Sequence, residues 1–425
     1  MNILLLGSGG REHALAWKLG KSELCGQLYI APGNAGTSSC GVNVDMSVTD
    51  FEEIKKFVLQ NDIHLLVVGP EEPLVLGIRD FLEADVAIKN LKIIGPGKLG
   101  AQLEGSKDFS KAFMKKYNIP TAAYSTFTVD NFEEGIAYLQ QHNLPIVLKA
   151  DGLAAGKGVV ICQSKEEAIA EFTAMIQDQK FGKASARVVV EEFLTGIEMS
   201  VFVLTDGKNF VLLPEAKDYK KIGEGEQGLN TGGMGAVSPV PFYDTALQEK
   251  VIKEIISPTI NGLAVENIPY VGIIFIGLIV ENGEAKLIEY NCRLGDPETE
   301  VVLTRLNNDL VELFEATANQ QLDTIKIETN NNHAAGIVAV SGGYPGDYKK
   351  NIPIKINAER NNSSTLFHAG TRQEGEQIVT NGGRLFVAVS EGETLKEAVA
   401  KSITTLDNVE YEGKYFRKDI GFEFF

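Results

Sequence analysis

Residues 286–300, KLIEYNCRLGDPETE, carry side chains that could bind a metal ion and a phosphate. Residues 287–290 are suited to a short buried strand, on which Glu289 and Asn291 leave the same face. A carboxylate and an amide oxygen are hard ligands for Mg²⁺ and leave coordination positions open for phosphate oxygens. Arg293 continues that face with a planar cation. An edge strand followed by an acidic, solvated turn at 295–298 would show the same pattern. This stretch alone therefore does not distinguish a metal and phosphate site from such a turn.

A second pattern of this kind lies at residues 146–158, IVLKADGLAAGKG. Lys149 falls on a buried-type strand, where an unpaired ammonium is costly, so it needs an anionic partner. The glycine-rich hairpin that follows could close over phosphates, although an ordinary glycine hairpin is the alternative. It is not a Walker A sequence, because no G-K-[ST] is present. Lys107, next to a predicted N-cap at Ser106, could also reach a phosphate or remain solvated.

The N-terminus predicts a strand at residues 2–6, a glycine turn and a helix. This geometry places backbone N–H groups against an anion. Glu12 stands where a dinucleotide fingerprint needs its third glycine, so a nicotinamide-type site is disfavoured. Gly9, Gly10 and Arg11 instead predict a turn that holds one phosphate. A tight turn capped by Arg11 is the alternative.

Further apolar runs at residues 28–30, 65–68 and 93–94 alternate with helical stretches such as 50–60. This alternation predicts a doubly wound parallel sheet, with ligands at the carboxyl ends of its strands. Glu71, in one of the loops at those ends, could bond ribose hydroxyls or be an exposed acid. His13 is expected on a helix surface and His64 at a strand end, and neither is given a role.

The central and C-terminal parts give weaker signals. Residues 218–230 show no apolar periodicity and predict a polar loop, which leads into a glycine nest at 230–236 able to hold an anion. Residues 271–280 predict a strand that turns at Asn282-Gly283 into the Glu289 strand. Residues 273–280 contain no carboxylate, so no second acidic ligand is expected there opposite Glu289. Strands at 333–340 and 384–389 and a helix at 394–405 indicate a small α+β domain. His333 and His368 are expected to be structural.

Length and composition set outer limits. A chain of 425 residues suggests about three domains, and a net charge of −17 disfavours nucleic-acid and anionic-membrane partners. The four cysteines are scattered without a C-x-x-C pair, which indicates a reducing compartment and no zinc site. Neither a secretory signal nor a membrane-spanning run is visible, so a cytoplasmic protein is expected.

In combination, these features resemble the ATP-grasp superfamily. More closely, GSGGREHALAWKL, APGNAGT, VVGPEEPLVLGI, QLEGSK, KADGLAAGKGV, NTGGMGA and EYNCRLGDPETE, in this order, resemble the phosphoribosylamine–glycine ligase (glycinamide ribonucleotide synthetase) family. The resemblance covers essentially the whole chain, including HAAGIVAVSGGYPG and a closing FRKDIG. It implies an N-terminal domain at 1–103, an ATP-grasp domain at 104–325 with a mobile lid near 124–192, and a C-terminal α+β domain at 326–425.

The resemblance also implies a reaction and its residues. ATP would phosphorylate glycine, and 5-phosphoribosylamine would attack the glycyl phosphate to give glycinamide ribonucleotide in purine biosynthesis, with Mg²⁺ or Mn²⁺. Catalysis is assigned to Lys149, Arg293 and Asp296, and metal binding to Glu289 and Asn291. ATP contacts are assigned to Lys107, Lys149, Gly152, Gly156, Lys157, Gly158, Glu191, Glu192, Phe193, Leu194 and Glu198. Substrate contacts are assigned to Gly9, Gly10, Arg11, Glu12, Asn34, Gly36, Pro70, Glu71, Gly232, Gly233, Met234, Arg293 and Asp296.

The chain departs from the family pattern in residues 218–230. Tyr219 stands where His is common, Lys221 where Arg is and Leu229 where Pro is, so Tyr219 and Lys221 receive no catalytic role. We expect a monomer, with a homodimer as the alternative. Other readings are an ATP-grasp enzyme with a different substrate pair, a nucleotide-binding regulatory module, and a nicotinamide dehydrogenase.

Overall fold

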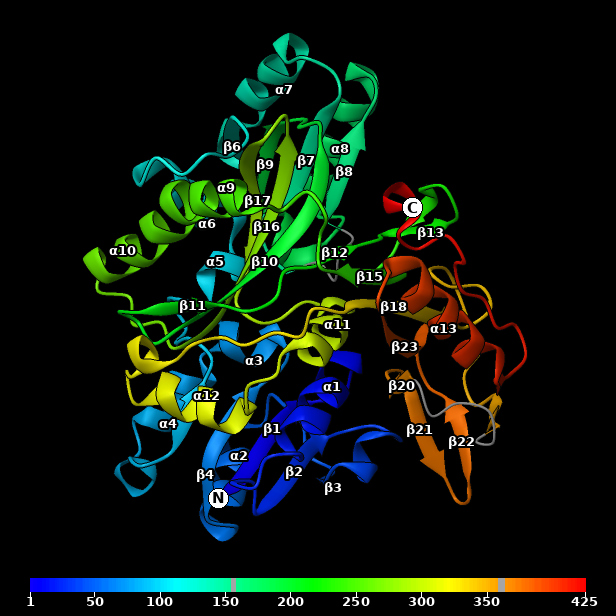
Figure 1. The fold of residues 1–425 in the computed structure, drawn as a ribbon. Helices are drawn as coiled ribbons and strands as arrows, with labels where there is room; N and C mark the ends of the chain where they lie inside the picture. The colour runs from blue at the N-terminus through cyan, green and yellow to red at the C-terminus, as the bar shows by residue number, and fades with distance from the viewer. Residues whose placement is uncertain (154–157, 358–363) are drawn as a thin grey trace.

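The computed structural model describes residues 1–153, 158–357 and 364–425. Its N-terminal part is a parallel five-stranded sheet in the order β3-β2-β1-β4-β5, drawn in blue in Figure 1. Its central strand β1 is a continuous apolar run and is almost wholly buried, as parallel strands covered on both faces are. The elements are β1 (Asn2–Gly7), α1 (Gly10–Leu19), β2 (Gln27–Pro32), β3 (Val42–Asn43), α2 (Phe51–Gln60), β4 (Ile63–Val68), α3 (Glu71–Leu76), α4 (Ile78–Glu83) and β5 (Lys92–Ile94). The predicted doubly wound sheet is confirmed.

The central part contains two antiparallel sheets. The lid sheet, in the order β6-β9-β7-β8, carries α7 and α8 and lies at the top of Figure 1. The second sheet runs β11-β10-β16-β17. The elements are α5 (Gln102–Gly105), α6 (Lys107–Lys116), β6 (Tyr124–Thr128), α7 (Phe132–Gln141), β7 (Ile146–Ala150), β8 (Val159–Cys162), α8 (Lys165–Ile176), β9 (Arg187–Glu192), β10 (Ile197–Thr205), β11 (Phe210–Leu212), α9 (Thr245–Val251), α10 (Ser257–Val265), β16 (Gly272–Glu281) and β17 (Glu284–Asn291).

The C-terminal part, orange to red in Figure 1, joins the rest through an antiparallel sheet in the order β12-β15-β18-β23-β20. This sheet takes β12 (Lys217–Asp218) and β15 (Gly235–Ser238) from the middle of the chain, so the two parts share backbone hydrogen bonds. The remaining elements are β13 (Lys221–Gly223), β14 (Gln227–Asn230), α11 (Glu298–Arg305), α12 (Leu310–Ala318), β18 (His333–Val340), β19 (Pro353–Ile356), β20 (Ser364–His368), β21 (Thr371–Glu374), β22 (Gln377–Thr380), β23 (Arg384–Gly392), α13 (Leu395–Asp407) and β24 (Val409–Glu410).

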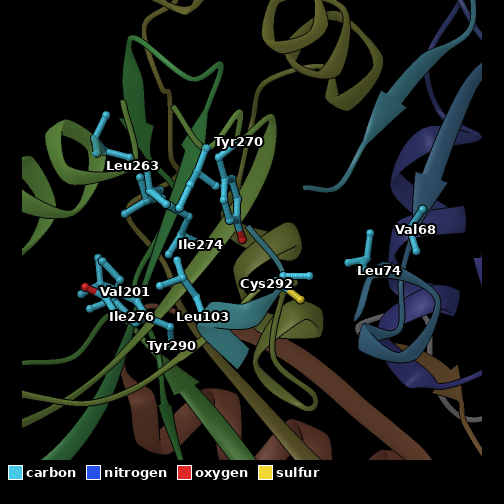
Figure 2. Packing of buried hydrophobic residues seen from close by; sticks show 14 of the residues in the cluster. Val68, Leu74, Leu103, Val201, Leu263, Tyr270, Ile274, Ile276, Tyr290 and Cys292 are labelled. Carbon is cyan, nitrogen blue, oxygen red and sulfur yellow. The ribbon is translucent and has the colours of Figure 1, made fainter. Parts of the chain in front are cut away.

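The hydrophobic cores tie these parts together. One core runs from Val68 and Leu74 of the N-terminal part through Cys292 to Ile274 on β16 and Tyr270 just before it, and Figure 2 shows Cys292 between the two groups. A second core joins α1 to α11, α12 and β18. The lid sheet and its helices pack into a separate core, as a unit that moves on its own would require.

Two local expectations were wrong. His13 is 6% exposed, because the C-terminal strand β20 covers this face of α1 and the backbone N–H of His368 donates to His13 Nδ1 at 2.7 Å. Residues 218–230, expected as a loop, include the hairpin β13–β14, whose residues are half-buried or exposed and so show no apolar pattern. The alternative of a solvated acidic turn after Gly295 does not hold, since Glu298 and Glu300 lie buried at the start of α11.

Candidate active site

A cleft lies where α6, the lid sheet and β17 meet. It is lined by eight residues predicted to bind ATP, metal or substrate: Glu71, Lys107, Lys149, Gly158, Glu191, Glu289, Asn291 and Arg293. Its other lining residues, among them Glu104, Ser110 and Lys111, were not predicted. Gly156 and Lys157 lie outside the described residues.

A β-bulge on β17 turns the two predicted metal ligands into this cleft. Leu278 pairs with Leu287, and the next residue, Gly277, pairs with Glu289, so Ile288 is the extra residue. Leu287 and Tyr290 therefore both face the core, while Glu289 and Asn291 share the opposite face. Without the bulge, simple alternation from Leu287 would have pointed Glu289 inward.

The side chains of Glu289 and Asn291 fit a divalent cation that is also held by phosphate. Within the described chain, neither makes a hydrogen bond or an ion pair, so both oxygen donors are available. No cluster of three or more His, Cys, Asp or Glu side chains among the described residues could hold a metal by itself. A carboxylate–amide pair of this type suits Mg²⁺ that keeps positions open for substrate oxygens.

The lysines of the cleft come from two elements, α6 and β7. Lys149 on β7 is 5% exposed, and its Nζ lies 3.0 Å from Glu191 Oε1, the anionic partner that its burial demanded. Glu191 sits diagonally across on β9, because Lys149 pairs with Val189. Lys107 begins α6 and donates to the carbonyl oxygen of Gly152 at 3.3 Å. Burial lowers the pKa of Lys107, and the nearby Glu289 carboxylate opposes that shift.

Lys111 is a cation that the sequence analysis missed. It is 2% exposed and lies 3.0 Å from Glu191 Oε2. Burial lowers the pKa of Lys111 to about 8, although Glu191 raises it. The available signal was its spacing, since Lys111 follows Lys107 by one helical turn and shares its face of α6.

Arg293 stands at the end of the cleft between two acids. Its NH2 group lies 2.8 Å from Glu104 Oε1, and its Nε lies 3.4 Å from Glu71 Oε2. Glu104 also accepts from the backbone N–H of Cys292 at 2.8 Å. Burial by itself would raise the pKa of Glu71, but Arg293 and Arg11 outweigh it and lower that pKa. Burial raises the pKa of Glu104 in spite of Arg293.

The glycine turn before α1 is occupied by the chain's own carboxylates. The backbone N–H of Gly9 donates to Glu12 Oε2 at 2.6 Å, and that of Arg11 donates to Asp296 Oδ2 at 3.3 Å. The Arg11 guanidinium donates to Glu12 at 2.8 Å and to the carbonyl oxygen of Leu294 at 2.8 Å. A phosphate at this turn would have to exchange with these contacts, and such binding stays a prediction.

Glu12 explains why the third glycine is absent. A Cβ on Gly7 would lie 2.3 Å from the Glu12 side chain, and one on Gly69 would lie 2.4 Å from it. The Glu12 carboxylate therefore fills the space under two glycine loops, at the carboxyl ends of β1 and β4. It shapes the loops in which substrate contacts were predicted.

The predicted substrate residues separate into two places. Gly9 and Asn34 border a cleft between the N-terminal loops and residues 369–373, while Glu71 lines the cation-rich cleft. The Asn34 side chain is fully engaged, since it donates to Ser8 O and His368 O at 2.9 Å and accepts from Gly36 N at 2.8 Å. Pro70 lies directly before α3, of which Glu71 is the first residue.

Arg384 connects the remaining predicted residues. This side chain of β23 lies 3.1 Å from Asp296 Oδ1 and donates to the carbonyl oxygens of Gly232 at 2.6 Å and Asp296 at 2.9 Å. Gly233, with φ of 116°, packs so closely that a Cβ would lie 2.4 Å from Pro297. Met234 is fully buried. Nothing local marked Arg384, because it opens a strand about 90 residues after Asp296 and reads as an ordinary surface cation.

The departure at Tyr219 has a structural reason. Tyr219 is fully buried, its hydroxyl donates to Glu423 Oε2 at 2.8 Å, and Lys217 Nζ lies 3.8 Å from its ring centroid.

The ATP contacts predicted after the lid sheet are more accessible: Phe193 is 40% exposed, and Glu198 pairs with Lys220 at 2.6 Å. Glu192 accepts from the backbone N–H of Ala123 at 3.1 Å.

Comparisons with known proteins cover the whole chain. Family profiles of phosphoribosylglycinamide synthetase match in consecutive segments: the N domain at residues 1–104, the ATP-grasp (A) domain at 105–299 and the C domain at 334–423. Phosphoribosylamine–glycine ligase from Pasteurella multocida (strain Pm70) is 44% identical over an alignment of 425 positions, which covers 99% of this chain and 98% of that protein.

The solved structures agree with this result. The crystal structure of phosphoribosylamine–glycine ligase from Thermotoga maritima has 35% identity and a TM-score of 0.85, covering 99% of this chain and 100% of that one. Biotin carboxylase from Campylobacter jejuni, at 15% identity and a TM-score of 0.74, covers 99% of this chain and 94% of its own, and shows the shared fold alone. None of the described helices is long and apolar enough to cross a membrane. The chain belongs to the phosphoribosylglycinamide synthetase family.

Proposed function

We propose that this chain ligates glycine to 5-phosphoribosylamine at the expense of ATP and forms glycinamide ribonucleotide, ADP and phosphate through a glycyl phosphate. The observation that carries the proposal is the cleft in which Lys107, Lys149 and Arg293 lie together with the side-chain oxygens of Glu289 and Asn291. Full-length similarity to phosphoribosylamine–glycine ligases gives the substrate pair.

In the first step, a glycine carboxylate oxygen attacks the γ-phosphorus of ATP and ADP leaves. A carboxylate is a poor acyl electrophile, so phosphorylation supplies the leaving group that ligation needs. Phosphoryl transfer depends on placement and charge neutralisation more than on a base. Lys107 and Lys149 would neutralise the phosphates, and Arg293 would face the developing charge. Mg²⁺ held by Glu289 and Asn291 would supply a Lewis acid for the same oxygens.

In the second step, the amine of 5-phosphoribosylamine attacks the carbonyl carbon and inorganic phosphate leaves. The amine loses its proton in forming the amide. Asp296 and the Gly232–Gly233 turn, held together by Arg384, stand on the side where the second substrate is expected. A lid that closes over the acyl phosphate would keep water away from it.

Several finer assignments belong to the same proposal. They are Mg²⁺ as the working ion with Mn²⁺ as its alternative, a cytoplasmic location, and a monomer with a homodimer as the alternative. The domain boundaries at 103/104 and 325/326 are also proposed. The N-domain and A-domain profile matches meet at 104/105, next to the first boundary, whereas the A-domain match ends at 299 and the C-domain match begins at 334, on either side of the second.

The test is ADP release with Mg²⁺ and ATP, with glycine and freshly generated phosphoribosylamine added separately and together. We expect release with both substrates, a product of the mass of glycinamide ribonucleotide, and loss of release when alanine or serine replaces glycine. ADP release with glycine alone would put the second substrate in question. No release from a protein that binds ATP would favour another substrate pair or a binding-only role.

A further inference from the structure

A buried cluster of three charges from three elements lies at the base of the cleft. Glu191 on β9 is 3% exposed and stands between Lys111 on α6 and Lys149 on β7. Each carboxylate oxygen has its own lysine: Lys111 Nζ lies 3.0 Å from Oε2, and Lys149 Nζ lies 3.0 Å from Oε1. The cluster therefore carries one positive charge more than it needs to neutralise Glu191.

We propose that Lys111 is a positioning residue that keeps Glu191 neutralised, so that Lys149 is released to bind the phosphates of ATP. The inference rests on the proposed function, in which Lys149 is a phosphate ligand. It adds a residue that the family resemblance did not assign. Lys111 itself would stay on Glu191 throughout the reaction.

The two lysines are held with different strength. Lys111 has a second, well-formed contact, since its Nζ donates to Thr121 Oγ1 at 2.8 Å, and Thr121 donates in turn to Leu287 O at 2.6 Å. Within the described part of the chain, the second contact of Lys149 is a long one, to Ile288 O at 3.4 Å. Among the described residues, no hydrogen bond is directed at Glu191 Oε1, so the Lys149 contact is ionic without good hydrogen-bond geometry.

The consequence follows from the burial of Glu191. Removing the only partner of a buried charge is strongly unfavourable, because the remaining charge is desolvated and unpaired. If Lys149 were the only cation on Glu191, each ATP that bound would have to separate that pair. With Lys111 fixed in place, Glu191 keeps a partner when Lys149 turns to a phosphate oxygen, and the excess positive charge of the cluster attracts the polyphosphate.

The experiment measures ATP affinity by calorimetry in the full-length protein, without glycine or amine. Lys111→Met keeps the length of the side chain and removes its charge, so Lys149 is held more tightly by Glu191. We expect the Kd for ATP to rise about tenfold or more, since part of the ATP binding energy is then used to break a buried pair. Lys115→Met on the same helix, where the side chain is exposed, is the matched control and should leave the Kd unchanged.

A double-mutant cycle separates this role from a general structural one. In a Glu191→Gln background there is no charge to neutralise, so adding Lys111→Met should change the ATP Kd by less than about twofold. An equally large loss in that background would overturn the proposal, and so would an unchanged Kd for Lys111→Met alone. If Lys111→Met does not fold, the comparison of Glu191→Gln with the double variant Glu191→Gln/Lys111→Met still tests the proposal, because neither variant holds an unpaired carboxylate.

The kinetic arm tests the same idea under turnover. We expect Lys111→Met to raise the KM for ATP while kcat and the KM for glycine stay within about threefold, since only nucleotide binding competes with the ion pair. A fall in kcat at saturating ATP would contradict a positioning role. Because the calorimetric arm needs no turnover, failure of the ligase reaction would not be confused with failure of this inference.

Discussion

The ATP side and the substrate side of the site hold their charges in different ways. On the ATP side, the side chains of Glu289 and Asn291 have no protein partners among the described residues. Two lysines, Lys111 and Lys149, share the one buried carboxylate of Glu191. On the substrate side, Arg11, Glu12, Asp296 and Arg384 already satisfy one another. The first arrangement is preorganised for an anionic ligand, whereas the second must exchange contacts to admit one.

The difference also reflects how each side is built. The ATP-side residues lie on β7 and β9 of the lid sheet, on β17 of the second sheet and on α6, all in the central part. The substrate-side contacts join different parts of the molecule, such as Asp296 with Arg384 and Arg11 with Leu294. We therefore expect loss of the ATP-side metal ligands to abolish chemistry, and changes on the substrate side to alter the placement of the second reactant.

The largest effect is expected for Glu289→Gln. The variant keeps the shape of the side chain and removes the anionic oxygen that would hold Mg²⁺, so kcat/KM should fall by at least about 10³-fold. Glycine-dependent ADP release measures it, with thermal unfolding as the check on folding. Glu284→Gln on the exposed part of the same strand is the control and should retain activity. A folded Glu289→Gln protein with full activity would remove the metal assignment.

Arg384→Met sharpens the comparison from the substrate side. Loss of this guanidinium frees Asp296 and the Gly232 turn, and misplacement of reacting groups by about an ångström can cost roughly 100-fold in rate. We expect kcat/KM for glycine or for the amine to fall by about 10- to 100-fold, while the Kd for ATP measured by calorimetry stays unchanged. Lys396→Met, which changes an exposed cation on α13 of the C-terminal part, is the control. A loss of ATP affinity would show that the two sides are not separable.

The contact between the N-terminal and C-terminal parts should weaken in acid. Burial, with His368 as a lesser cause, lowers the pKa of His13 to about 3, and burial lowers the pKa of His368 to about 4. Both histidines take up protons on unfolding below their ordinary pKa of about 6.5. The stabilisation that the two neutral histidines give the folded state is therefore complete above about pH 6.5. It is lost as the pH falls from about 6.5 toward about 4.

Urea unfolding at about pH 7 and about pH 4.5 measures this loss of stability. Each histidine adds up to about 1.4 kcal/mol per pH unit to the slope of the unfolding free energy against pH. His13→Asn keeps an acceptor for the His368 N–H and cannot be protonated in this range. We expect its free energy of unfolding to vary less with pH than that of the unchanged protein. Identical pH profiles would show that His13 does not titrate in the way its burial implies.

The smallest effect is expected for Tyr219→His, which introduces the residue common in the family. Because Tyr219 is fully buried and bonded to Glu423, its loss should reduce the free energy of unfolding by about 1–2 kcal/mol. Activity should remain within about threefold, since the side chain packs against the C-terminal tail and touches no predicted ligand. A large fall in kcat without a loss of stability would give Tyr219 a catalytic role.

Whether a site residue could be predicted from the sequence depends on how far along the chain its partners lie. Residues fixed by one strand or one turn, such as Lys149 and the N-cap Ser106, were placed correctly. Even so, the outward orientation of Glu289 depends on a bulge that the alternation of residues does not reveal. Partners brought together across the chain could not be predicted. Glu104 and Arg384 show no local pattern, and the helical spacing of Lys111 after Lys107 does not reveal that its partner is Glu191. His13 was misjudged for the same reason, since β20 buries it from far along the sequence.

The most direct test of the account follows an oxygen atom from glycine to phosphate. If glycine labelled with ¹⁸O in its carboxylate attacks ATP and the amine then displaces phosphate, the bridging oxygen leaves with that phosphate. We predict one ¹⁸O in each inorganic phosphate formed with glycine, ATP, Mg²⁺ and phosphoribosylamine, read by mass spectrometry. Unlabelled phosphate from a reaction that still yields the amide would contradict the glycyl phosphate and the role given to this cleft.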